Sequence, residues 1–396
     1  MISGILDLLS KLIRGPARFI RTRRSAQIIL LIVVTAFVAI LIRNVLVAAR
    51  MRRLTIAYSY AGEIHLASAD GIIAHQLTQG VTTQQRYDQE NWLYGVSYDL
   101  SGSFLASPAY RLASWYQSTR PEDIFSSDPS WSPDGQRLAY LSCIGLGCEI
   151  VISDIDGLAP QTLLCDCLTP HSRPVWSPDG EKIAAIGLYV DGSGNVIDHI
   201  TIFSVGEDDS IILPNLPGHY IESLSWSPES DEIVYSARRV PTEEEATAFG
   251  FSDQAEDLGL ILPPPQVYDL FLVRSDGRYN PIPLSNNGYS LEEIEVSWSP
   301  DRDLLAMVAR ERSPDSYNAT DLFTINLAKL EIYKITDTPL IAESDISWSI
   351  DGQYLYFNLG FDNHYQAARI HRNGGNIELL LPDFEIHGRL EEREVE

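Results

Sequence analysis

The sequence of 396 residues is poor in basic residues and in sulfur-containing residues. It has four cysteines and three methionines, and its 29 lysines and arginines face 54 aspartates and glutamates, which gives a formal net charge of −25 at pH 7. This balance excludes nucleic acid as the expected partner, because phosphate contacts require Lys and Arg. It is compatible with solubility, with cation binding or with a basic partner.

Catalytic motifs are also missing. The chain contains no Gly-x-Ser-x-Gly elbow and no His-Glu-x-x-His sequence, which are local signatures of serine hydrolases and zinc peptidases. Its eight histidines are scattered, so we expect surface or loop positions for them. The Gly-rich stretch 191–198 lacks the spacing of a twelve-residue calcium loop and is assigned to a hairpin. We therefore predict no enzymatic activity, no metal site and no cofactor.

A hydrophobic run of the usual membrane-spanning length is absent as well. Ile28–Ile42 is the longest apolar stretch, with fifteen residues that carry no charge, whereas a spanning helix needs roughly 20. Val45–Ala49 continues the apolar character, and Arg43 between them can extend toward the lipid headgroups. We predict a transmembrane helix over 26–49 that is preceded by a basic cytoplasmic segment, residues 1–25.

The orientation of this segment follows from its basic residues. Six basic residues precede the apolar run and four follow it, which favours a cytoplasmic N-terminus and an extracytoplasmic remainder. The alternative is a cleaved signal peptide ending at Val47-Ala48-Ala49. An uncleaved single-pass anchor is favoured, because Arg43 interrupts the region before that cleavage site and Arg50 would follow it.

A short motif built around Trp-Ser-Pro-Asp-Gly repeats through the rest of the chain. Its copies begin at Trp131, Trp176, Trp226, Trp298 and Trp348, and a fainter copy begins at Tyr98. The shared turn residues are Asp134, Gly135, Asp179, Gly180, Asp301, Asp351 and Gly352. Repeats at such spacings indicate a solenoid, a propeller or another array.

Each copy is followed by the same succession of short elements. Pro and Gly form a tight turn, and a five- or six-residue apolar run follows, as at 137–142. An alternating segment and its return come next, as at 149–154 and 161–164. These runs are too short for helices and are rich in strand-forming residues. Four antiparallel strands that repeat radially make a β-propeller blade, and we expect each Trp to pack between neighbouring blades.

The Trp-Ser-Pro-Asp-Gly motif, together with Ile-x-x-x-Asp-x-Asp-Gly and the Leu-Thr pairs at Leu77-Thr78 and Leu168-Thr169, resembles the TolB-type propeller repeat. The resemblance covers residues 54–388 and implies an all-β propeller fold. Relatives with this repeat include periplasmic binding proteins and the propeller domain of prolyl-oligopeptidase-like enzymes. The motif is structural, so it says little about function.

The number of blades depends on how the first repeats are divided. Residues 54–78 read as three strands without their own Trp strand, and six Trp-type units follow. This pattern favours seven blades, with Phe384–Gly388 supplying a missing strand that closes the ring. Six blades is the alternative, if 54–118 forms one unit. Residues 389–396 are assigned to a charged tail.

All four cysteines lie within 25 residues, at Cys143, Cys148, Cys165 and Cys167. In a blade, antiparallel strands bring these positions to one rim. We predict two disulfides in an oxidising compartment. Cys143–Cys148 competes with a bond from Cys148 to Cys165 or Cys167, and the sequence leaves this connectivity open. A four-cysteine zinc site is the alternative, although the spacing differs from that of common zinc modules.

Two segments are candidate binding loops on the face where second strands connect to third strands. Arg238–Gln266 is a 29-residue insertion that includes Glu243, Glu244 and Glu245, and insertions of this length are usually functional or disordered. The second segment, 110–125, contains residue types that are enriched in binding hot spots, although Trp115 and Tyr116 could equally be core residues of a strand. Its candidate residues are Arg111, Trp115, Tyr116 and Arg120.

These features together predict a membrane-anchored extracytoplasmic propeller. We expect it to act as a non-enzymatic scaffold that binds a protein or a small ligand on the loop-rich face or across the central channel. The alternatives are a propeller hydrolase or lyase with a site at the channel mouth, or a membrane-bound sensor. An enzyme would require His and carboxylate groups on the innermost strands, and the Trp-type strands are expected to offer chiefly Ser, Pro and aromatic residues.

Overall fold

The chain divides into two compact units, residues 1–52 and 53–396. In the computed structural model, the described part of the first unit is Val34 alone, and the second unit is described over most of its length. The described ranges are 34, 56–60, 63–68, 74–78, 124–144, 147–155, 160–163, 173–190, 196–207, 209–248, 267–284, 291–311, 320–329, 331–338, 341–361, 364–380 and 387–392. Among these residues, no helix has the length and apolar character needed to cross a membrane. The predicted anchor at 26–49 lies outside the described residues, apart from Val34.

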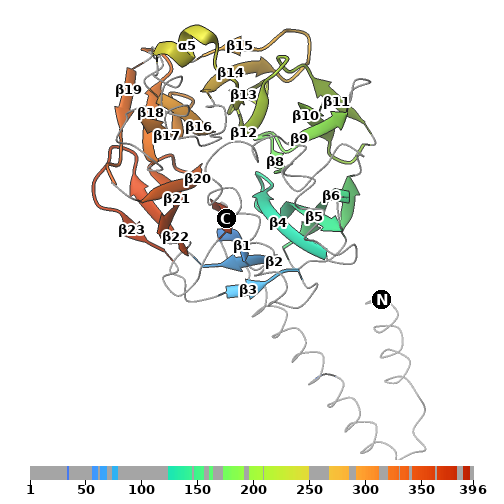
Figure 1. Cartoon of the computed structure of the whole chain (residues 1–396). Helices are drawn as coiled ribbons and strands as arrows, with labels where there is room; N and C mark the ends of the chain where they lie inside the picture. The colour runs from blue at the N-terminus through green and yellow to red at the C-terminus, as the bar shows by residue number, and fades with distance from the viewer. Residues whose placement is uncertain are drawn as a thin grey trace, which may run out of the picture. The chain divides into compact units, whose positions relative to one another are not determined.

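The second unit is an all-β propeller of six four-stranded antiparallel sheets, which we number as blades 1 to 6 (Figure 1). Blade 1 contains β24 (His387–Glu392), β1 (Ile56–Tyr60), β2 (Glu63–Ala67) and β3 (Ala74–Gln76). Blade 2 contains β4 (Ile124–Trp131), β5 (Arg137–Ile144), β6 (Gly147–Asp154) and β7 (Gln161–Leu163). Blade 3 contains β8 (Val175–Trp176), β9 (Lys182–Val190), β10 (Val196–Ser204) and β11 (Ser210–Leu213).

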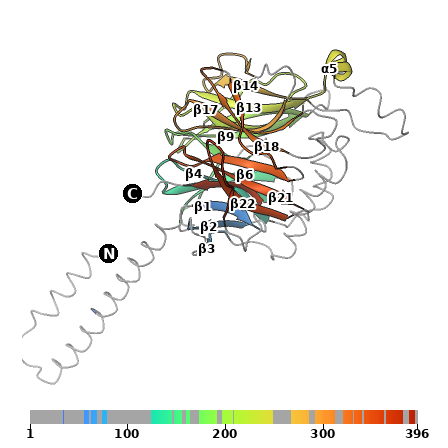
Figure 2. The same cartoon turned by 90° about the vertical axis from the view of Figure 1, so that its left-hand side faces the viewer.

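The remaining blades follow the same order along the chain. Blade 4 contains β12 (Tyr220–Trp226), β13 (Glu232–Arg239), β14 (Val267–Arg274) and β15 (Ile282–Pro283), with the short helix α5 (Glu243–Ala248) between β13 and β14. Blade 5 contains β16 (Leu291–Trp298), β17 (Leu304–Glu311), β18 (Asp321–Asn326) and β19 (Glu331–Lys334). Blade 6 contains β20 (Ala342–Trp348), β21 (Tyr354–Phe361), β22 (His364–His371) and β23 (Glu378–Leu379). The Trp strands β4, β8, β12, β16 and β20 lie nearest the centre of the ring, and α5 lies beyond the strand ends on one face (Figures 1 and 2).

The ring closes by pairing the two ends of the second unit. β24 pairs with β1, with Ile56 opposite Glu392 and Ser59 opposite His387, so it takes the innermost place that the Trp strand takes in the other blades. A closing strand was expected at Phe384–Gly388. The observed strand starts three residues later and includes 389–392, which the sequence assigned to a charged tail.

The preferred count of seven blades is wrong, and the alternative of six is correct. The sequence treated the strands after residue 54 and the unit around Tyr98 as two blades. In the structure, β24 completes the first blade, and both β1 and β24 pack directly against β4 of blade 2. No blade therefore separates blades 1 and 2, and the unit at 92–118 lies outside the described residues.

The hydrophobic cores lie between adjacent blades. Trp226 is 4% exposed and packs in one cluster with Ile186 and Ile202 of blade 3, and its ring N–H donates to the backbone carbonyl of Val175 at 3.0 Å. Trp348 of blade 6 packs against blade 5 in the same way. The indoles therefore act as wedges between sheets, as the repeat predicts, and their N–H groups can be satisfied by the preceding inner strand.

Serines next to the tryptophans join the inner strands to one another. Ser130 Oγ accepts the backbone N–H of Trp176 at 3.1 Å, and Ser225 Oγ accepts that of Trp298 at 2.9 Å. These buried bonds satisfy inner-strand amides that have no strand partner on the side facing the next blade. They also fix the distance between successive blades near the ring centre.

The Ser-Pro-Asp-Gly segment forms the turn from the first to the second strand of a blade. Ser177 Oγ donates to Asp179 Oδ1 at 2.5 Å and accepts the N–H of Lys182 at 2.9 Å. Gly180 follows at φ +75°, a left-handed conformation that a Cβ disfavours. In blades 4 and 5 this position holds Ser230 and Arg302, which adopt φ values of +62° and +66°. The turn geometry is thus retained even where glycine is absent.

Substituting Gly180 tests the conformational demand of this turn. We expect Gly180→Ala to lower the free energy of unfolding by about 1 kcal/mol, since the left-handed region costs a non-glycine residue roughly that much. Steric overlap adds little, because a Cβ at Gly180 would meet Pro133 Cδ at 3.6 Å. Gly180→Asn should lose less, because Asn visits this region more readily. Denaturant unfolding of the three proteins provides the measurement, and equal losses for Ala and Asn would contradict the explanation.

Candidate functional site at the centre of the ring

Five inner strands place a residue at the same structural position, three residues before the Trp. These residues are Asp128, Arg173, Ser223, Glu295 and Asp345. In β4 and β20 this residue lies inside a shift of the pairing register and has no strand partner. In β12 and β16 the residue left out of the pairing is Glu222 or Ile294, and Ser223 and Glu295 pair with the second strand. A β-bulge of this kind re-aims the side chain of the extra residue. In blades 2 and 6 the bulge therefore releases Asp128 and Asp345 from the regular alternation of the strand.

Arg173 connects three blades. Its Nε lies 3.6 Å from Asp128 Oδ1 in blade 2, and its Nη1 lies 3.4 Å from Asp345 Oδ1 in blade 6. Arg173 itself leads into β8 of blade 3, which in a six-membered ring is opposite blade 6. The guanidinium therefore reaches across the ring axis. The Arg173 side chain is 34% exposed, whereas those of Asp128 and Asp345 are 11% and 7% exposed.

Asp345 is held firmly by its own blade. Its Oδ2 accepts the Asn358 Nδ2–H at 3.1 Å and the Ser344 hydroxyl at 3.0 Å. Its buried Oδ1 accepts no hydrogen bond and faces Arg173 only through the ion pair. The carboxylate is thus preorganised, with one oxygen anchored and the other directed at the charged partner.

Backbone strain gathers at the same three residues. Five described non-glycine residues have positive φ, and two of them, Ser230 and Arg302, occupy the glycine position of the repeat turn. The other three are Asp128, Arg173 and Asp345, with φ of +52°, +26° and +58°. Strained conformations persist where the surrounding structure holds them, and they cluster at functional sites. This coincidence makes the group of three residues, which we call the axial cluster, the candidate site.

The equivalent residues of blades 4 and 5 contact the backbone of the next blade. Glu295 Oε2 accepts the N–H of Ile346 at 3.2 Å, and Ser223 Oγ accepts the N–H of Val296 at 3.1 Å. These contacts join the inner strands and support the position of the neighbouring Asp345. Ser223 and Glu295 therefore contribute to the frame of the site.

The three predicted acidic loop residues lie in different environments. Glu243, Glu244 and Glu245 form the first turn of α5. Glu245 is 4% exposed, receives two hydrogen bonds of 2.7 Å from the Arg239 guanidinium, and accepts the N–H of Thr242 at 2.7 Å. The bonds from Arg239 lower the pKa of the Glu245 carboxyl to about 2. Glu245 is thus a capping residue of the helix, while Glu243 and Glu244 are exposed.

The other predicted binding residues, Arg111, Trp115, Tyr116 and Arg120, lie outside the described residues. The insertion that was assigned to 238–266 is shorter than expected, since β13 continues through Arg239 and α5 occupies Glu243–Ala248. It does connect a second strand to a third strand, as the repeat predicted. Residues 249–266 lie outside the described part of the chain.

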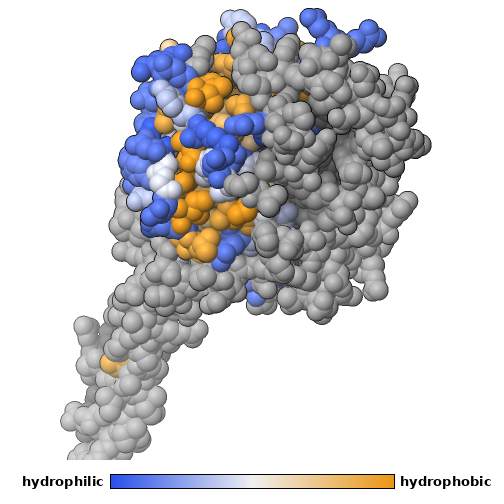
Figure 3. Space-filling model, turned by 60° about the vertical axis from the view of Figure 1, so that its left-hand side comes forward, coloured by the Kyte–Doolittle hydropathy of each residue, from blue (hydrophilic) through white to orange (hydrophobic). Residues whose placement is uncertain are grey.

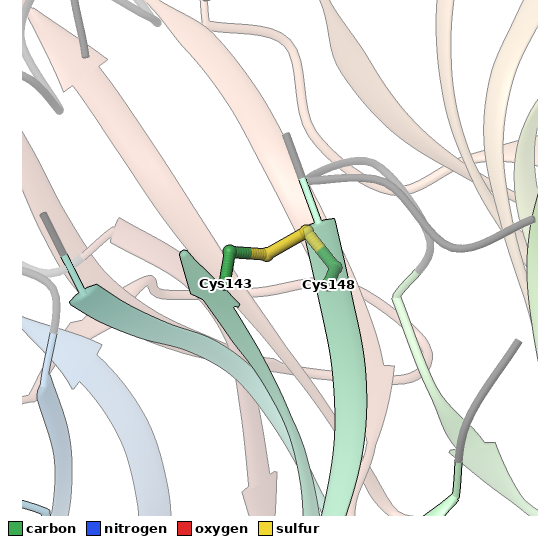
Figure 4. Close-up of a disulfide and its surroundings, with 2 residues drawn as sticks. All are labelled: Cys143 and Cys148. Atoms are coloured by element: carbon green, nitrogen blue, oxygen red, sulfur yellow. A yellow bond between two sulfur atoms is a disulfide. The ribbon is translucent and has the colours of Figure 1, made fainter. Parts of the chain in front are cut away.

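One predicted disulfide is present. Cys143 and Cys148 are paired across β5 and β6 and joined by a disulfide (Figure 4). Both residues are buried between blades 2 and 3, so the bond fixes a hairpin that contributes to an inter-blade core. Cys165 and Cys167 lie outside the described residues. The four-cysteine zinc alternative is wrong for this structure, because the disulfide takes up two of the thiolates that it requires.

The described residues contain no group of three or more His, Cys, Asp or Glu side chains suited to a metal ion. One histidine departs from its expected surface position. His199 in β10 is 3% exposed and faces Gly187, where an added Cβ would lie 2.6 Å from its Nε2. Burial lowers the pKa of the His199 imidazole, which is therefore a neutral core residue.

Glu343 is a second buried carboxyl near the inner strands. It is 1% exposed at the start of β20, and burial raises its pKa to about 7 against the opposing effect of a hydrogen bond from the Thr338 hydroxyl. The nearby charge of Asp321 raises it further. Its Oε2 has no hydrogen-bond partner. Glu343 therefore titrates near neutrality but does not meet solvent.

The outer surface offers a groove between blades 5 and 6, with a volume of 610 Å³. It is lined by Ile335, Thr336, Asp337, Thr338, Ile370, Gly375, Asn376 and Ile377. Hydrophobic side chains on this side of the propeller alternate with hydrophilic ones (Figure 3). The lining brings no strained residue and no inter-blade ion pair, so the axial cluster remains the stronger candidate.

The sequence interpretation missed the axial cluster. It described the Trp strands as carriers of Ser, Pro and aromatic residues and placed the carboxylates in turns. The available signal was the position three residues before each Trp, where the aligned copies read Asp, Arg, Ser, Glu and Asp. The bulges that turn Asp128 and Asp345 out of the blade interface could not be predicted from the alternation of apolar and polar residues in the strands.

The ionisation of Glu343 gives a pH-dependent stability. Its folded pKa of about 7 lies above its ordinary value of 4.5, so its contribution is complete below pH 4.5 and is lost as the pH rises through 7. We expect Glu343→Gln to gain up to about 3 kcal/mol of unfolding free energy relative to wild type between pH 4.5 and pH 8. Urea unfolding across this range measures the difference. Glu207→Gln, at an exposed position, serves as the control, and a flat difference for Glu343→Gln would contradict the buried titration.

Comparison with known proteins places the fold. No protein-family model matches the chain, and no curated protein matches its sequence. TolB from Acinetobacter baumannii matches with a TM-score of 0.55 at 15% identity, over 85% of this chain and 66% of that chain, just under two thirds of its length. A chain of the nidogen/laminin complex matches with a TM-score of 0.52 at 9% identity, over 85% and 98%. Oligogalacturonate lyase in complex with manganese gives a TM-score of 0.43 at 12% identity, over 63% of each chain. Similarity at these identities shows the fold alone, which is a TolB-like six-bladed β-propeller.

Proposed function

We propose that the propeller is a non-enzymatic binding scaffold whose partner contacts the axial cluster from the loop-rich face. The observation that carries this proposal is the meeting of three inner-strand residues from blades 2, 3 and 6, all in strained backbone conformations. A structural ion pair alone does not require three bulged or left-handed positions. Preorganised polar groups on a rigid scaffold are typical of binding sites.

Accessibility supports the same role. Arg173 is 34% exposed although it lies among inner strands, so a ligand can reach the cluster. The helix α5 lies in the connection between β13 and β14 and extends beyond the strands on one face (Figure 2). A partner can therefore use the loops for area and the axial cluster for specificity.

The enzyme alternative has weaker support. The described carboxyl whose pKa lies near neutrality, Glu343, is 1% exposed and cannot touch a substrate. The carboxylates of the axial cluster are largely buried and are paired with Arg173. This arrangement suits recognition of charge better than transfer of a proton.

We further propose that residues 26–49 anchor the protein in a membrane, with the N-terminus cytoplasmic and the propeller extracytoplasmic. The uncharged run Ile28–Ile42 and its basic flanks support the anchor. The disulfide Cys143–Cys148 supports an oxidising compartment for the propeller. A sensor that signals through the anchor remains the second role that this topology would permit.

Variants of the axial cluster test the binding role. With the full-length chain as bait in extracts of its host, we expect Asp345→Asn and Asp128→Asn to reduce recovery of at least one wild-type partner by tenfold or more, because each removes a charge that fixes Arg173. Asp276→Asn, on an exposed turn of blade 4, should behave as wild type. Thermal melts confirm that each bait is folded. Recovery of the same partners in the same amounts by all four proteins would refute the proposed contact surface.

Thiol accessibility tests the proposed compartment. When the protein is isolated from its host, denatured without reductant and alkylated, we expect none of the four cysteines to be labelled, because export allows both predicted bonds to form. Mass spectrometry identifies the labelled residues. Four labelled thiols would contradict export, and labelling of Cys165 and Cys167 alone would contradict the second disulfide.

A further inference from the structure

The axial cluster contains one cation among acidic residues. The position three residues before the Trp carries three carboxylates, Asp128, Glu295 and Asp345, and one basic residue, Arg173. The chain as a whole has a formal charge of −25, so the field at the ring centre attracts positive groups. The two carboxylates that flank Arg173 form the natural environment of a guanidinium or an ammonium.

The contacts of Arg173 with these carboxylates are longer than the tightest arginine–carboxylate pairs of the protein. They measure 3.6 Å and 3.4 Å, whereas Arg239 meets Glu245 at 2.7 Å and Arg372 meets Asp301 at 2.7 Å. Charge-assisted hydrogen bonds of this type are usually about 2.7–2.9 Å long. Both contacts of Arg173 exceed this length, so its guanidinium does not form a short bridge between blades 2 and 6. A guanidinium that is not attached to blade 3 could approach both carboxylates more closely.

The two carboxylate acceptors are buried, and Arg173 is the exposed member of the cluster. Asp345 is 6% exposed, and two bonds to its Oδ2 fix the carboxylate while Oδ1 accepts no hydrogen bond. A buried carboxylate oxygen without a hydrogen bond is rare in folded proteins and calls for a donor. Because Oδ1 faces Arg173, the donor that completes the site must approach from the position that the guanidinium now occupies.

A metal ion fits this place less well than an organic cation. The described residues provide no set of three metal-ligating side chains, and two carboxylates on separate blades lack the oxygen donors that calcium requires. A planar guanidinium or an ammonium offers several N–H donors and can bridge two separate acceptors. The carboxylate acceptors and the charge of the site thus favour an organic cation as the ligand.

We propose that the axial cluster is a binding site for the guanidinium or ammonium group of an arginine or lysine side chain on a partner protein, and that Arg173 occupies this site in the unbound protein. This inference rests on the proposed function in taking the cluster as the contact surface. Partner binding displaces Arg173 from Asp128 and Asp345 and places the partner's side chain between them. Arg173 then acts as an internal competitor that lowers the affinity for weakly basic segments.

Chemical rescue tests the ligand class with a defined probe. In the full-length Arg173→Ala protein, we expect methylguanidinium chloride at tens of millimolar to raise the melting temperature by about 2–4 °C above the value in NaCl of equal ionic strength, because a ligand that binds only the folded state stabilises it. The effect should saturate with concentration. Wild type should show no such difference, because Arg173 fills the site, and Arg173→Ala/Asp345→Asn should show none, because the acceptor is lost.

Two other outcomes would overturn the proposed site. Absence of a saturable shift in Arg173→Ala, or an equal shift in the double variant, would overturn the site. If Arg173→Ala does not fold in NaCl, methylguanidinium should restore its folding during refolding, and failure to do so would also overturn the proposal. Because the probe is a small cation, this failure would remove the ligand class without affecting the partner-capture result, so the two proposals are tested separately.

Discussion

The structure depends on the packing of each sheet against the next. None of the blades encloses a core of its own, since the apolar clusters consist of side chains from two adjacent sheets, as Trp226 does with Ile186 and Ile202 of the preceding blade. The indole contributes a large apolar area and a donor for the carbonyl of the previous inner strand. Because every sheet relies on two neighbours, the ring must close to be stable. β24 meets this need by pairing the C-terminal end of the unit with β1.

This constraint also determines what can lie at the centre. Inner strands that converge on an axis leave little space for large side chains. Their unpaired edges carry amide groups that face a neighbouring blade. Ser130 and Ser225 satisfy such amides with short hydroxyls. At the bulges of blades 2 and 6, Asp128 and Asp345 leave the interface and meet Arg173 of blade 3 across the axis. A single inner strand therefore contributes some residues to the packing between blades and others to the charged group at the centre.

Much of the fold could be predicted from the sequence, because the repeat motif encodes local structure directly. Ser177, Asp179 and Gly180 specify a turn through short-range hydrogen bonds and one left-handed residue, and the strands that follow are legible as short apolar runs. The blade count failed because the first blade borrows its inner strand from the other end of the chain, a pairing that no local pattern reports. Glu245 was interpreted as a binding residue, yet its capping contact with Thr242 could be read from the spacing Thr-x-x-Glu. The axial cluster could not be predicted from the sequence, because Arg173 and Asp345 are far apart in the chain and meet only when opposite blades face each other.

The internal repeats offer a way to separate residues that the fold requires from residues that it permits. Equivalent positions in different blades share the same structural demands, so a position that keeps its residue type in every copy is one that the blade needs. The serine after each Trp behaves in this way, because its hydroxyl completes the turn in all five copies. The position three residues before each Trp does the opposite, with Asp, Arg, Ser, Glu and Asp at equivalent places. Since the blade accepts all of these residues, blade architecture alone does not dictate which charge stands there. The placement of one arginine between two aspartates, each in a strained conformation, is therefore the feature of the inner strands on which the proposed binding role depends.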